Sequence, residues 1–219
     1  MDYKQLATEM HATRDFSDRP LAQADIEDIV ALAQHAPSWA DSQPWKVYVA
    51  QGDTLKKIKQ EHAKHVDAGI HGRAEMATLL GTRWDDYSEE SIGDWGESVE
   101  AYLKEKHMNY DDTFLASERN LFNAPALLYV TIPKETNAWS IYDAGSFSQG
   151  LMMAAASKGI DTMPAYEIVK YPGTLHTILG IPQAEMLVIG IALGYRSEKP
   201  INDFKAGRRP TKDILEFKD

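Results

Sequence analysis

Two uninterrupted apolar runs constrain the fold of this chain more than any other feature. They read ALLYVTI, from Ala126 to Ile132, and MLVIGIAL, from Met186 to Leu193. A strand with one solvated face alternates apolar and polar residues, whereas a run without alternation suits a strand that is covered on both faces. Pro133 ends the first run. The sequence therefore predicts central strands with helices on both sides of their sheet.

Helical patterns flank these runs and supply the layers that cover a sheet. Residues 22–35 carry apolar side chains on one stripe, and Leu21 with Ile26 makes a hydrophobic staple if Ala22 is the N-cap. Lys46–Ala50 read KVYVA, which is a strand pattern. Further helices are expected over residues 3–11, 53–65 with Asp53 as N-cap, 94–106, 141–158 ended by Gly159, and 175–179. These elements predict one α+β domain with a mixed sheet, built from the runs near residues 46, 127, 162 and 187.

The composition excludes several classes of protein. The chain has no cysteine, which excludes disulfides, thiolate metal sites and a cysteine nucleophile. Its net charge of −10 argues against general nucleic-acid binding, which needs a basic surface. No apolar run reaches the roughly 18 residues of a membrane span, and the charged first residues do not form a signal peptide. We therefore expect a cytoplasmic protein, one domain over residues 1–219, that binds neither nucleic acid nor a membrane.

The segment from Ala36 to Trp45, APSWADSQPW, joins the helix at 22–35 to the strand at 46–50. Pro37 and Pro44 remove two backbone donors and bias the residues before them toward extended conformations. Trp39 and Trp45 place two large rings in the same short segment. A plain linker rarely combines so many aromatic and turn-forming residues, so this junction is the first candidate for a binding site.

Three separated motifs resemble the FMN-dependent nitroreductase family. The junction is similar to the family pattern APSxxNxQPW, with Asp41 in place of Asn. HATRDF (His11–Phe16) and GYRSEKPIN (Gly194–Asn202), the latter followed by RRP at Arg208–Pro210, are supporting matches. The resemblance runs over nearly the whole chain and is weakest at about residues 66–115. It implies a three-layer α-β-α fold with a mixed, mainly antiparallel sheet, in a homodimer with two FMN sites at the subunit interface.

The resemblance also implies an activity. It indicates an FMN-dependent oxidoreductase that transfers hydride from NADPH or NADH to the flavin, and then electrons to a small planar acceptor such as a nitroaromatic or a quinone. No catalytic side chain is expected, because the flavin carries the chemistry. The alternatives are a flavin reductase or a narrower flavin-dependent dehydrogenase of the same fold, and a flavin-binding protein without turnover.

The family's contacts can be carried over onto matching positions. His11 and Arg14 match basic residues that hold the FMN phosphate, Arg208 matches the arginine of the family's R-x-P motif, and Lys205 stands near an earlier basic residue. DTMPAY, Asp161–Tyr166, matches a short strand that passes beside the isoalloxazine ring. The expected cofactor-binding residues are His11, Ala12, Arg14, Pro37, Ser38, Trp39, Asp41, Gln43, Asp143, Pro164, Ala165, Tyr166, Glu167, Lys205 and Arg208.

This chain departs from the family at some of these positions. Members of the family often have Arg and Ser where Met10 and Ala12 stand here, so two possible phosphate contacts are lost. Asp41, if ionised near the flavin, opposes the negative charge that builds up on reduction. Asp143 falls where members of the family carry a polar residue near the ribityl chain.

Two regions leave alternatives open. His62 and His65 are three positions apart on one helix with acidic residues nearby, so a metal site is conceivable, but a polar helix end explains the pattern more simply and we expect no metal. Residues 66–115 hold aromatic residues among many acids. They either cover the substrate side of the flavin or form a peripheral pair of helices.

Overall fold

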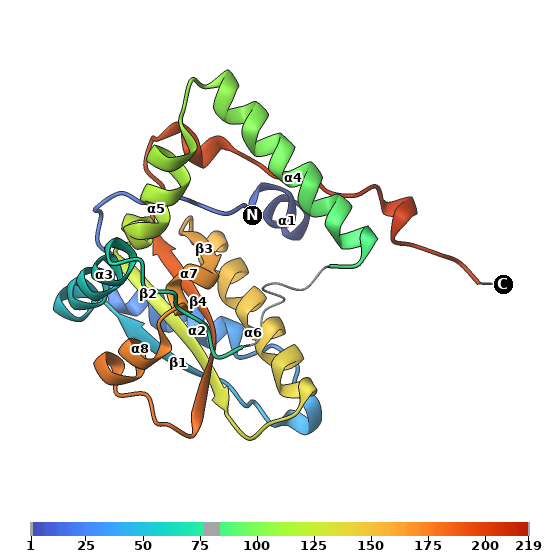
Figure 1. Cartoon of the computed structure of the whole chain (residues 1–219). Coiled ribbons are helices and arrows are strands. Elements are labelled where there is room, and N and C mark those ends of the chain that lie inside the picture. Colours follow the sequence, from blue (N-terminus) through green and yellow to red (C-terminus); the bar gives the residue numbers. More distant parts are fainter. Residues whose placement is uncertain (1, 77–83, 219) are drawn as a thin grey trace.

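A computed structural model of the chain describes residues 2–76 and 84–218 (Figure 1). Its sheet has four strands in the order β1-β2-β4-β3, namely β1 (Lys46–Ala50), β2 (Ala126–Pro133), β3 (Asp161–Ala165) and β4 (Glu185–Gly194). All three neighbouring pairs are antiparallel. Among the described residues the sheet is thus antiparallel throughout, where the sequence predicts a mixed one. Strand direction depends on how the connections cross the sheet, and a local pattern does not encode that.

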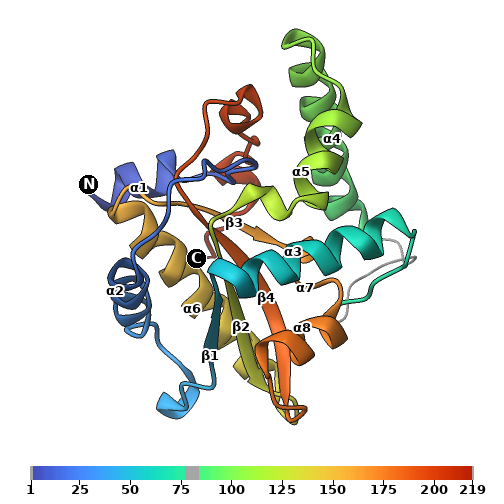
Figure 2. The same cartoon turned by 90° about the vertical axis from the view of Figure 1, so that its left-hand side faces the viewer.

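The three-layer arrangement is confirmed, with helices on both faces of the sheet (Figure 2). One face is covered by α2 (Gln23–Ala33) and α6 (Ala138–Ser157), and the other by α3 (Gly52–Asp67), α7 (Tyr166–Val169) and α8 (Pro172–Leu179). Side chains of β2 alternate between the two cores, with Leu128 and Val130 in one and Leu127 and Tyr129 in the other. Because both faces are buried, β2 needs apolar residues at every position, as its sequence indicated.

Capping explains where several helices begin. α6 starts at Ala138, slightly earlier than expected, because the side chain of Asn137 accepts hydrogen bonds from Trp139 N and Ser140 N. α4 (Asp86–Glu105) starts well before Asp94, because the Asp85 side chain accepts from Ser88 N at 3.0 Å. The expected N-cap Asp53 lies instead in the first turn of α3, after Gln51 as N-cap. At that position its carboxylate still favours the positive end of the helix dipole.

A smaller outer lobe stands on one end of the sheet (Figure 1). It comprises α4, a π-helical turn (Asp111–Leu115), α5 (Ala116–Arg119) and the chain from Pro200 onward, around a core of Val99, Leu103, Phe114, Ile201 and Phe204. The region at 66–115, which the sequence marks as variable, contributes α4 and the π-helical turn to this lobe; its residues 77–83 lie outside the described residues. No described helix is both long enough and apolar enough to span a membrane. The remaining helix, α1 (Tyr3–Glu9), begins the described chain.

Candidate functional site

The N-terminal motif and the motif after β4 lie side by side at one end of the sheet. Phe16 forms an antiparallel bridge with Arg196, and Thr13 N donates to Thr162 O in β3 at 3.0 Å. Ser197 N donates to Asp15 O at 3.0 Å. Two of the three motifs that carry the resemblance are therefore one structural unit, although they come from opposite ends of the chain.

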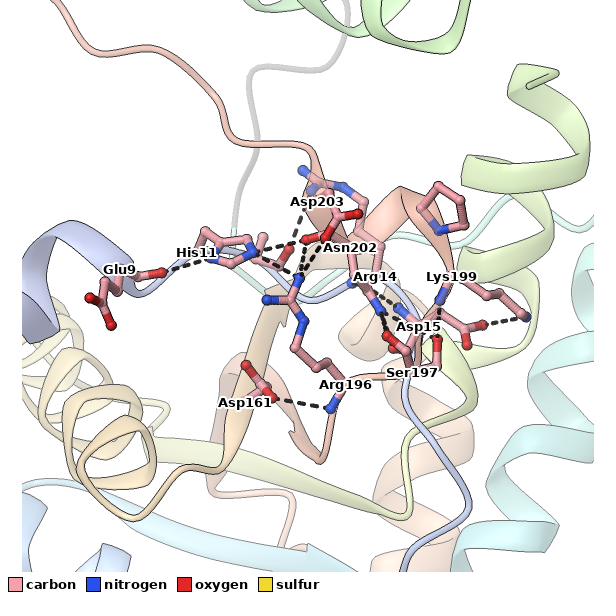
Figure 3. A network of polar contacts seen from close by, with 12 residues as sticks. Glu9, His11, Arg14, Asp15, Asp161, Arg196, Ser197, Lys199, Asn202 and Asp203 are labelled. Atoms are coloured by element: carbon pink, nitrogen blue, oxygen red, sulfur yellow. Dashed lines mark hydrogen bonds and ion pairs between the residues drawn. The ribbon is translucent and has the colours of Figure 1, made fainter. Parts of the chain in front are cut away.

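Asn202 joins these two segments. Its side chain is almost fully buried, and its Oδ1 accepts from Arg14 N at 2.9 Å and from Asp15 N at 3.0 Å (Figure 3). Its Nδ2 donates to Asp15 O at 2.7 Å and to Ser197 O at 3.0 Å. The sequence analysis included Asn202 only as the last letter of a motif. Its position next to a proline-containing loop gave no sign that it would satisfy four backbone groups.

A strained turn holds the same N-terminal segment from the other side. Leu121, Phe122 and Asn123 have φ values of 46°, 61° and 58°, in the left-handed region that costs a non-glycine residue roughly 1–2 kcal/mol. Phe122 O accepts from Phe16 N at 2.9 Å, and Asn123 Nδ2 donates to Asp15 Oδ2 at 2.8 Å. Three adjacent strained residues persist only where the surroundings fix them, and such strain concentrates at functional sites. The backbone around Arg14 is therefore held rigidly.

Arg14 itself is a buried cation with few partners. The residue is only 9% exposed, and its guanidinium carbon lies 5.2 Å from the ring centroids of both Phe114 and Phe204, which contact each other edge to face. Among the described residues it makes one hydrogen bond, from Nη1 to Ala12 O at 3.3 Å. Burial lowers the pKa of Arg14, and the charge of Glu118 opposes that shift in part. A buried charge without an ionic partner is costly, so this side chain suits an anionic ligand.

A cavity of about 390 Å³ opens beside this unit, between α1, the end of α6 and the start of β3. Its basic lining residues are His11, Arg196 and Lys205, and Met10 and Thr162 also line it. The volume falls in the range of ligand-binding pockets. Of the residues expected at the cofactor, His11 and Lys205 are thus brought together, whereas Ala12 and Arg14 follow His11 within three positions but do not line this cavity. Arg196 was not among those expected.

Arg208 takes a different position. Its Nη1 donates to Ala206 O and Gly207 O at 3.2 and 2.8 Å, and it lines a second cavity of about 470 Å³ beside α4. The neighbouring Arg209 fixes this segment to α4 through Glu90, 3.0 Å away. The structure thus does not bring Arg208 to Arg14 within one chain, and their convergence on one phosphate stays a prediction.

The corner between β3 and α7 holds the residues expected beside the flavin ring, Pro164, Ala165, Tyr166 and Glu167. The Glu167 carboxylate pairs with Lys170 Nζ at 2.9 Å and lies 3.3 Å from Nε2 of the buried His62. Burial alone would raise the pKa of Glu167, but the contacts with His62 and Lys170 lower it. This cluster pins the first turn of α7 to α3, so the corner is well fixed.

The same contacts account for the two histidines that raised the metal alternative. His62 faces Glu167, and His65 stacks on Tyr171 with ring centroids 4.6 Å apart. In the described parts of the chain, no three His, Asp or Glu side chains are arranged to hold a metal ion.

The junction forms a separate group of the expected residues. Trp39 N donates to Oδ2 of the buried Asp143 on α6 at 3.0 Å, so these two expected residues meet. Within the junction, Gln43 N donates to Ser38 Oγ at 3.0 Å. The backbone is strained here too, with left-handed φ values at Ala40, Asp41 and Gln43, of which Gln43 and Asp41 also share a side-chain hydrogen bond of 3.0 Å.

Comparisons with known proteins agree with this geometry. The nitroreductase family model matches residues 7–195. Among curated proteins, 4-nitrobenzoate reductase of Pseudomonas putida is 26% identical, covering 99% of this chain and 95% of the relative. Nitrobenzene nitroreductase of Ectopseudomonas oleovorans is 24% identical, covering 97% and 95%. The solved structure of the FMN-dependent nitroreductase NfnB from Mycobacterium smegmatis, in complex with NADPH, matches with a TM-score of 0.87 at 23% identity, covering 99% of this chain and 97% of that chain. Since the family model spans most of the sequence, this chain belongs to the nitroreductase family.

Proposed function

We propose that this protein is an FMN-dependent oxidoreductase that takes hydride from NADPH or NADH and passes electrons to a nitroaromatic or a similar planar acceptor. Membership of the family supports the proposal, as do relatives named 4-nitrobenzoate reductase and nitrobenzene nitroreductase. The observation that carries it is Arg14, a guanidinium that is 9% exposed and has a single hydrogen bond among the described residues. A flavin nucleotide supplies the negative charge that this residue lacks.

The residues present fit FMN. Positive charge for the phosphate is available from Lys205 in the cavity lining and from the buried Arg14, and His11 offers a ring nitrogen. The rigid corner at Pro164–Glu167 offers backbone groups to the ring. When bound, FMN supplies a reversible hydride acceptor, so the protein needs no nucleophile of its own. Thr162, which lines the cavity, and Ala165, at the corner, are three residues apart on β3. They lie roughly 10 Å apart, the order of length of a ribityl chain.

We further propose that the working unit is a homodimer. The junction contacts α6 near Asp143, whereas the cavity reaches α6 at Ala156. These positions lie roughly 20 Å apart along the helix axis. One chain therefore keeps its two groups of expected cofactor residues apart. A second copy, related by a two-fold axis, can bring the junction of one chain to the cavity side of the other.

Exposed aromatic residues support such an interface. Trp39 and Trp139 stack with centroids 5.3 Å apart, and Tyr142 lies against Trp139, yet the three side chains are 60%, 54% and 68% exposed. Aromatic residues are enriched at protein interfaces, and a cluster of this kind on an isolated chain indicates a surface that a partner covers. The cluster belongs to the junction and α6, which are the elements that the proposed dimer joins.

The chain's own contribution to the reaction is to bind, orient and exclude water. The fixed corner of one chain and the junction of the other would hold one side of the ring, which would leave a single face for donor and acceptor to use in turn. Stacking on that face turns a bimolecular transfer into an effectively unimolecular one. NAD(P)H must therefore leave before the acceptor enters, and we expect ping-pong kinetics.

The test is direct. Purified protein should be yellow, should bleach when NADPH or NADH is added without oxygen, and should regain colour with 4-nitrobenzoate or a benzoquinone. Reciprocal plots of initial rates across both substrates should give parallel lines, and light scattering should give the mass of a dimer. A colourless protein that takes up no flavin would overturn the proposal. A yellow protein that neither nucleotide reduces would leave it as a flavin-binding protein and refute the enzyme.

A further inference from the structure

Arg196 belongs to the GYRSEKPIN motif, but it was not among the residues expected to bind the cofactor. It follows β4 directly, and its side chain extends toward His11 and Asn202 (Figure 3). Arg196 Nη2 donates to Asn202 O, lies 3.3 Å from His11 Nε2, and makes a long contact of 3.6 Å with Oδ1 of the exposed Asp203. Its backbone N donates to Asp161 Oδ2 at 3.1 Å. Both the backbone and the guanidinium of this residue are therefore fixed in place.

The fixed guanidinium still has donors to offer. Its Nε and Nη1 make no hydrogen bond to any described residue, and Arg196 lines the cavity of about 390 Å³. Arginine is well suited to phosphate because its planar group presents several N–H donors and is always charged. An anion site requires an arginine that is held in place and still has free N–H donors. Arg196, at the wall of the cavity, meets both conditions.

His11 lies at the same place. Its Nδ1 lies 2.7 Å from Glu9 O, and its Nε2 lies 2.9 Å from Asn202 O. These contacts hold the imidazole ring beside the Arg196 guanidinium. Lys205 lines the same cavity.

The acidic residues of the cavity are engaged elsewhere. The Asp161 carboxylate accepts from the backbone N of Arg196, and the Glu9 carboxylate accepts from Gln5 Nε2 at 3.1 Å. The whole chain carries a net charge of −10, so a cavity with several basic side chains differs from the acidic character of the chain as a whole. Neither of these carboxylates forms an ion pair with Arg196 or Lys205 among the described residues, so both cations can face a negative group in the cavity.

We infer that Arg196 binds the phosphate of the flavin nucleotide and replaces the contacts that Met10 and Ala12 no longer make. Met10 lines the same cavity as Arg196, so an arginine at either position could reach the same anion. This inference rests on the proposed function, since it names the residue that selects FMN over riboflavin at that site. Asn202 and His11 act as positioning residues for the Arg196 guanidinium.

The experiment measures the dissociation constants of FMN and riboflavin for the flavin-free protein by quenching of flavin fluorescence. Arg196→Gln should weaken FMN binding by about tenfold or more, because a hydrogen bond to a charged group is lost. Riboflavin, which has no phosphate, should bind within about twofold of the original. Arg19→Gln is the matched control, because Arg19 stacks on the ring of Tyr195, next to Arg196, but does not line the cavity. It should change neither constant.

A rescue variant separates phosphate binding from a structural role. Adding Met10→Arg to Arg196→Gln should restore most of the lost FMN affinity without changing the affinity for riboflavin. If Arg196→Gln does not fold, Arg196→Lys carries the test, because it keeps the charge and loses the forked donors. Equal losses for FMN and riboflavin would overturn the inference, as would a failure of Met10→Arg to restore FMN affinity. If the original protein binds neither flavin, the proposed function itself fails, and that outcome is distinct from the other two.

Discussion

The two ends of strand β4 both hold buried charge, but only at one end does the chain satisfy that charge with several close partners. At the first end, the Glu185 carboxylate accepts from Tyr48 OH at 2.9 Å and from Thr131 Oγ1 at 2.7 Å, and it pairs with Lys46 Nζ. Burial alone would raise the pKa of Glu185, but the bonds from Lys46, Thr131 and Tyr48 lower it. Both oxygens of this carboxylate are satisfied by the chain.

At the other end, beyond Gly194, the charges are satisfied less completely: buried Arg14 has no ion pair among the described residues, and the exposed Arg196 has a long contact of 3.6 Å with the exposed Asp203. Arg14 is buried with one hydrogen bond to a carbonyl, and Arg196 keeps two nitrogens unused among the described residues. The backbone there is nevertheless held firmly, by Asn202 and by the strained turn at Leu121–Asn123. The fold therefore fixes the positions of these cations and leaves donors of both guanidinium groups free among the described residues.

The difference separates charges that serve stability from charges that serve binding. A buried charge that the chain satisfies contributes to folding, and its removal should leave ligand affinity unchanged. A buried charge that the chain does not satisfy reduces the stability of the empty protein and is compensated when a ligand binds. The two ends of β4 should consequently respond to mutation in opposite ways.

The largest effect should come from Asn202→Ala, which tests whether the binding end is rigid. Four backbone groups on Arg14, Asp15 and Ser197 lose their partner in a buried place. Each unmade bond costs about 1–3 kcal/mol, so the free energy of unfolding should fall by on the order of 4 kcal/mol. Urea denaturation measures it. The control Asn137→Ala, which removes only the exposed cap of α6, should cost about 1 kcal/mol. Equal costs for the two variants would show that water replaces the Asn202 bonds.

Arg14→Met should have the next largest effect. It removes the buried positive charge that lacks an ionic partner among the described residues. Methionine keeps apolar contact with Phe114 and Phe204 but removes the cation. The loss of a charged hydrogen bond, about 1.5–3 kcal/mol, should raise the FMN dissociation constant roughly ten- to hundredfold. The flavin-free protein should be as stable as before, or more stable, because a desolvated charge is gone. A large loss of stability with unchanged FMN affinity would reverse the roles assigned to the two ends.

The same titration on Arg208→Ala tests the convergence that the sequence predicts. Arg208 is exposed and bonded only to carbonyls of its own segment. A loss of FMN affinity as large as that of Arg14→Met would require this side chain to turn toward the phosphate when the flavin binds. No loss would assign the phosphate to the residues around His11 alone.

Glu185→Gln should have a smaller effect. It tests the end of β4 at which the chain satisfies its buried carboxylate. Since the pKa of Glu185 is lowered in the folded state, its stabilisation is complete above the ordinary glutamate value of about 4.3 and is lost as the pH falls through the folded value. The variant should be less stable by about 1–2 kcal/mol at neutral pH, and the difference should vanish in acid. Urea titrations from pH 7 to pH 3 measure it, and FMN affinity should stay constant. A difference that persists at pH 3 would mean that shape rather than charge matters at this position.

Much of the fold follows from local sequence. β1 lies over Lys46–Ala50 as its alternation indicated, and β2 and β4 extend the two apolar runs by a residue or so at their ends. Helix starts were less accurate where a cap was overlooked, as at Asp85 and Asn137. Such caps are present in the sequence, and weighting them more heavily would have placed these starts correctly.

The candidate site was predictable only where a motif resembled a family. Asn202 and the groups it binds on Arg14 and Asp15 are 187 positions apart or more, so no local pattern links them. The left-handed turn at Leu121–Asn123 contradicts the preferences of its own residues and exists because tertiary contacts fix it. Arg196 belongs to a motif that resembles the family, but its proposed role in anion binding depends on a cavity formed by three separate segments of the chain.

The smallest effect should come from Asp41→Asn, which asks whether the junction of a second copy reaches the flavin. Asp41 is exposed, and its Oδ1 accepts from Gln43 Nε2 at 3.0 Å. A carboxylate near the ring opposes the charge gained on reduction, but water and salt screen an exposed charge. The asparagine variant should therefore raise the flavin midpoint potential by only on the order of 20 mV, and less at high salt. Spectroelectrochemical titration resolves such a shift, with Asp53→Asn on α3 as an exposed control. An unchanged potential at low salt would place Asp41 away from the flavin, and would leave the binding end of β4 as the sole source of charge at the site.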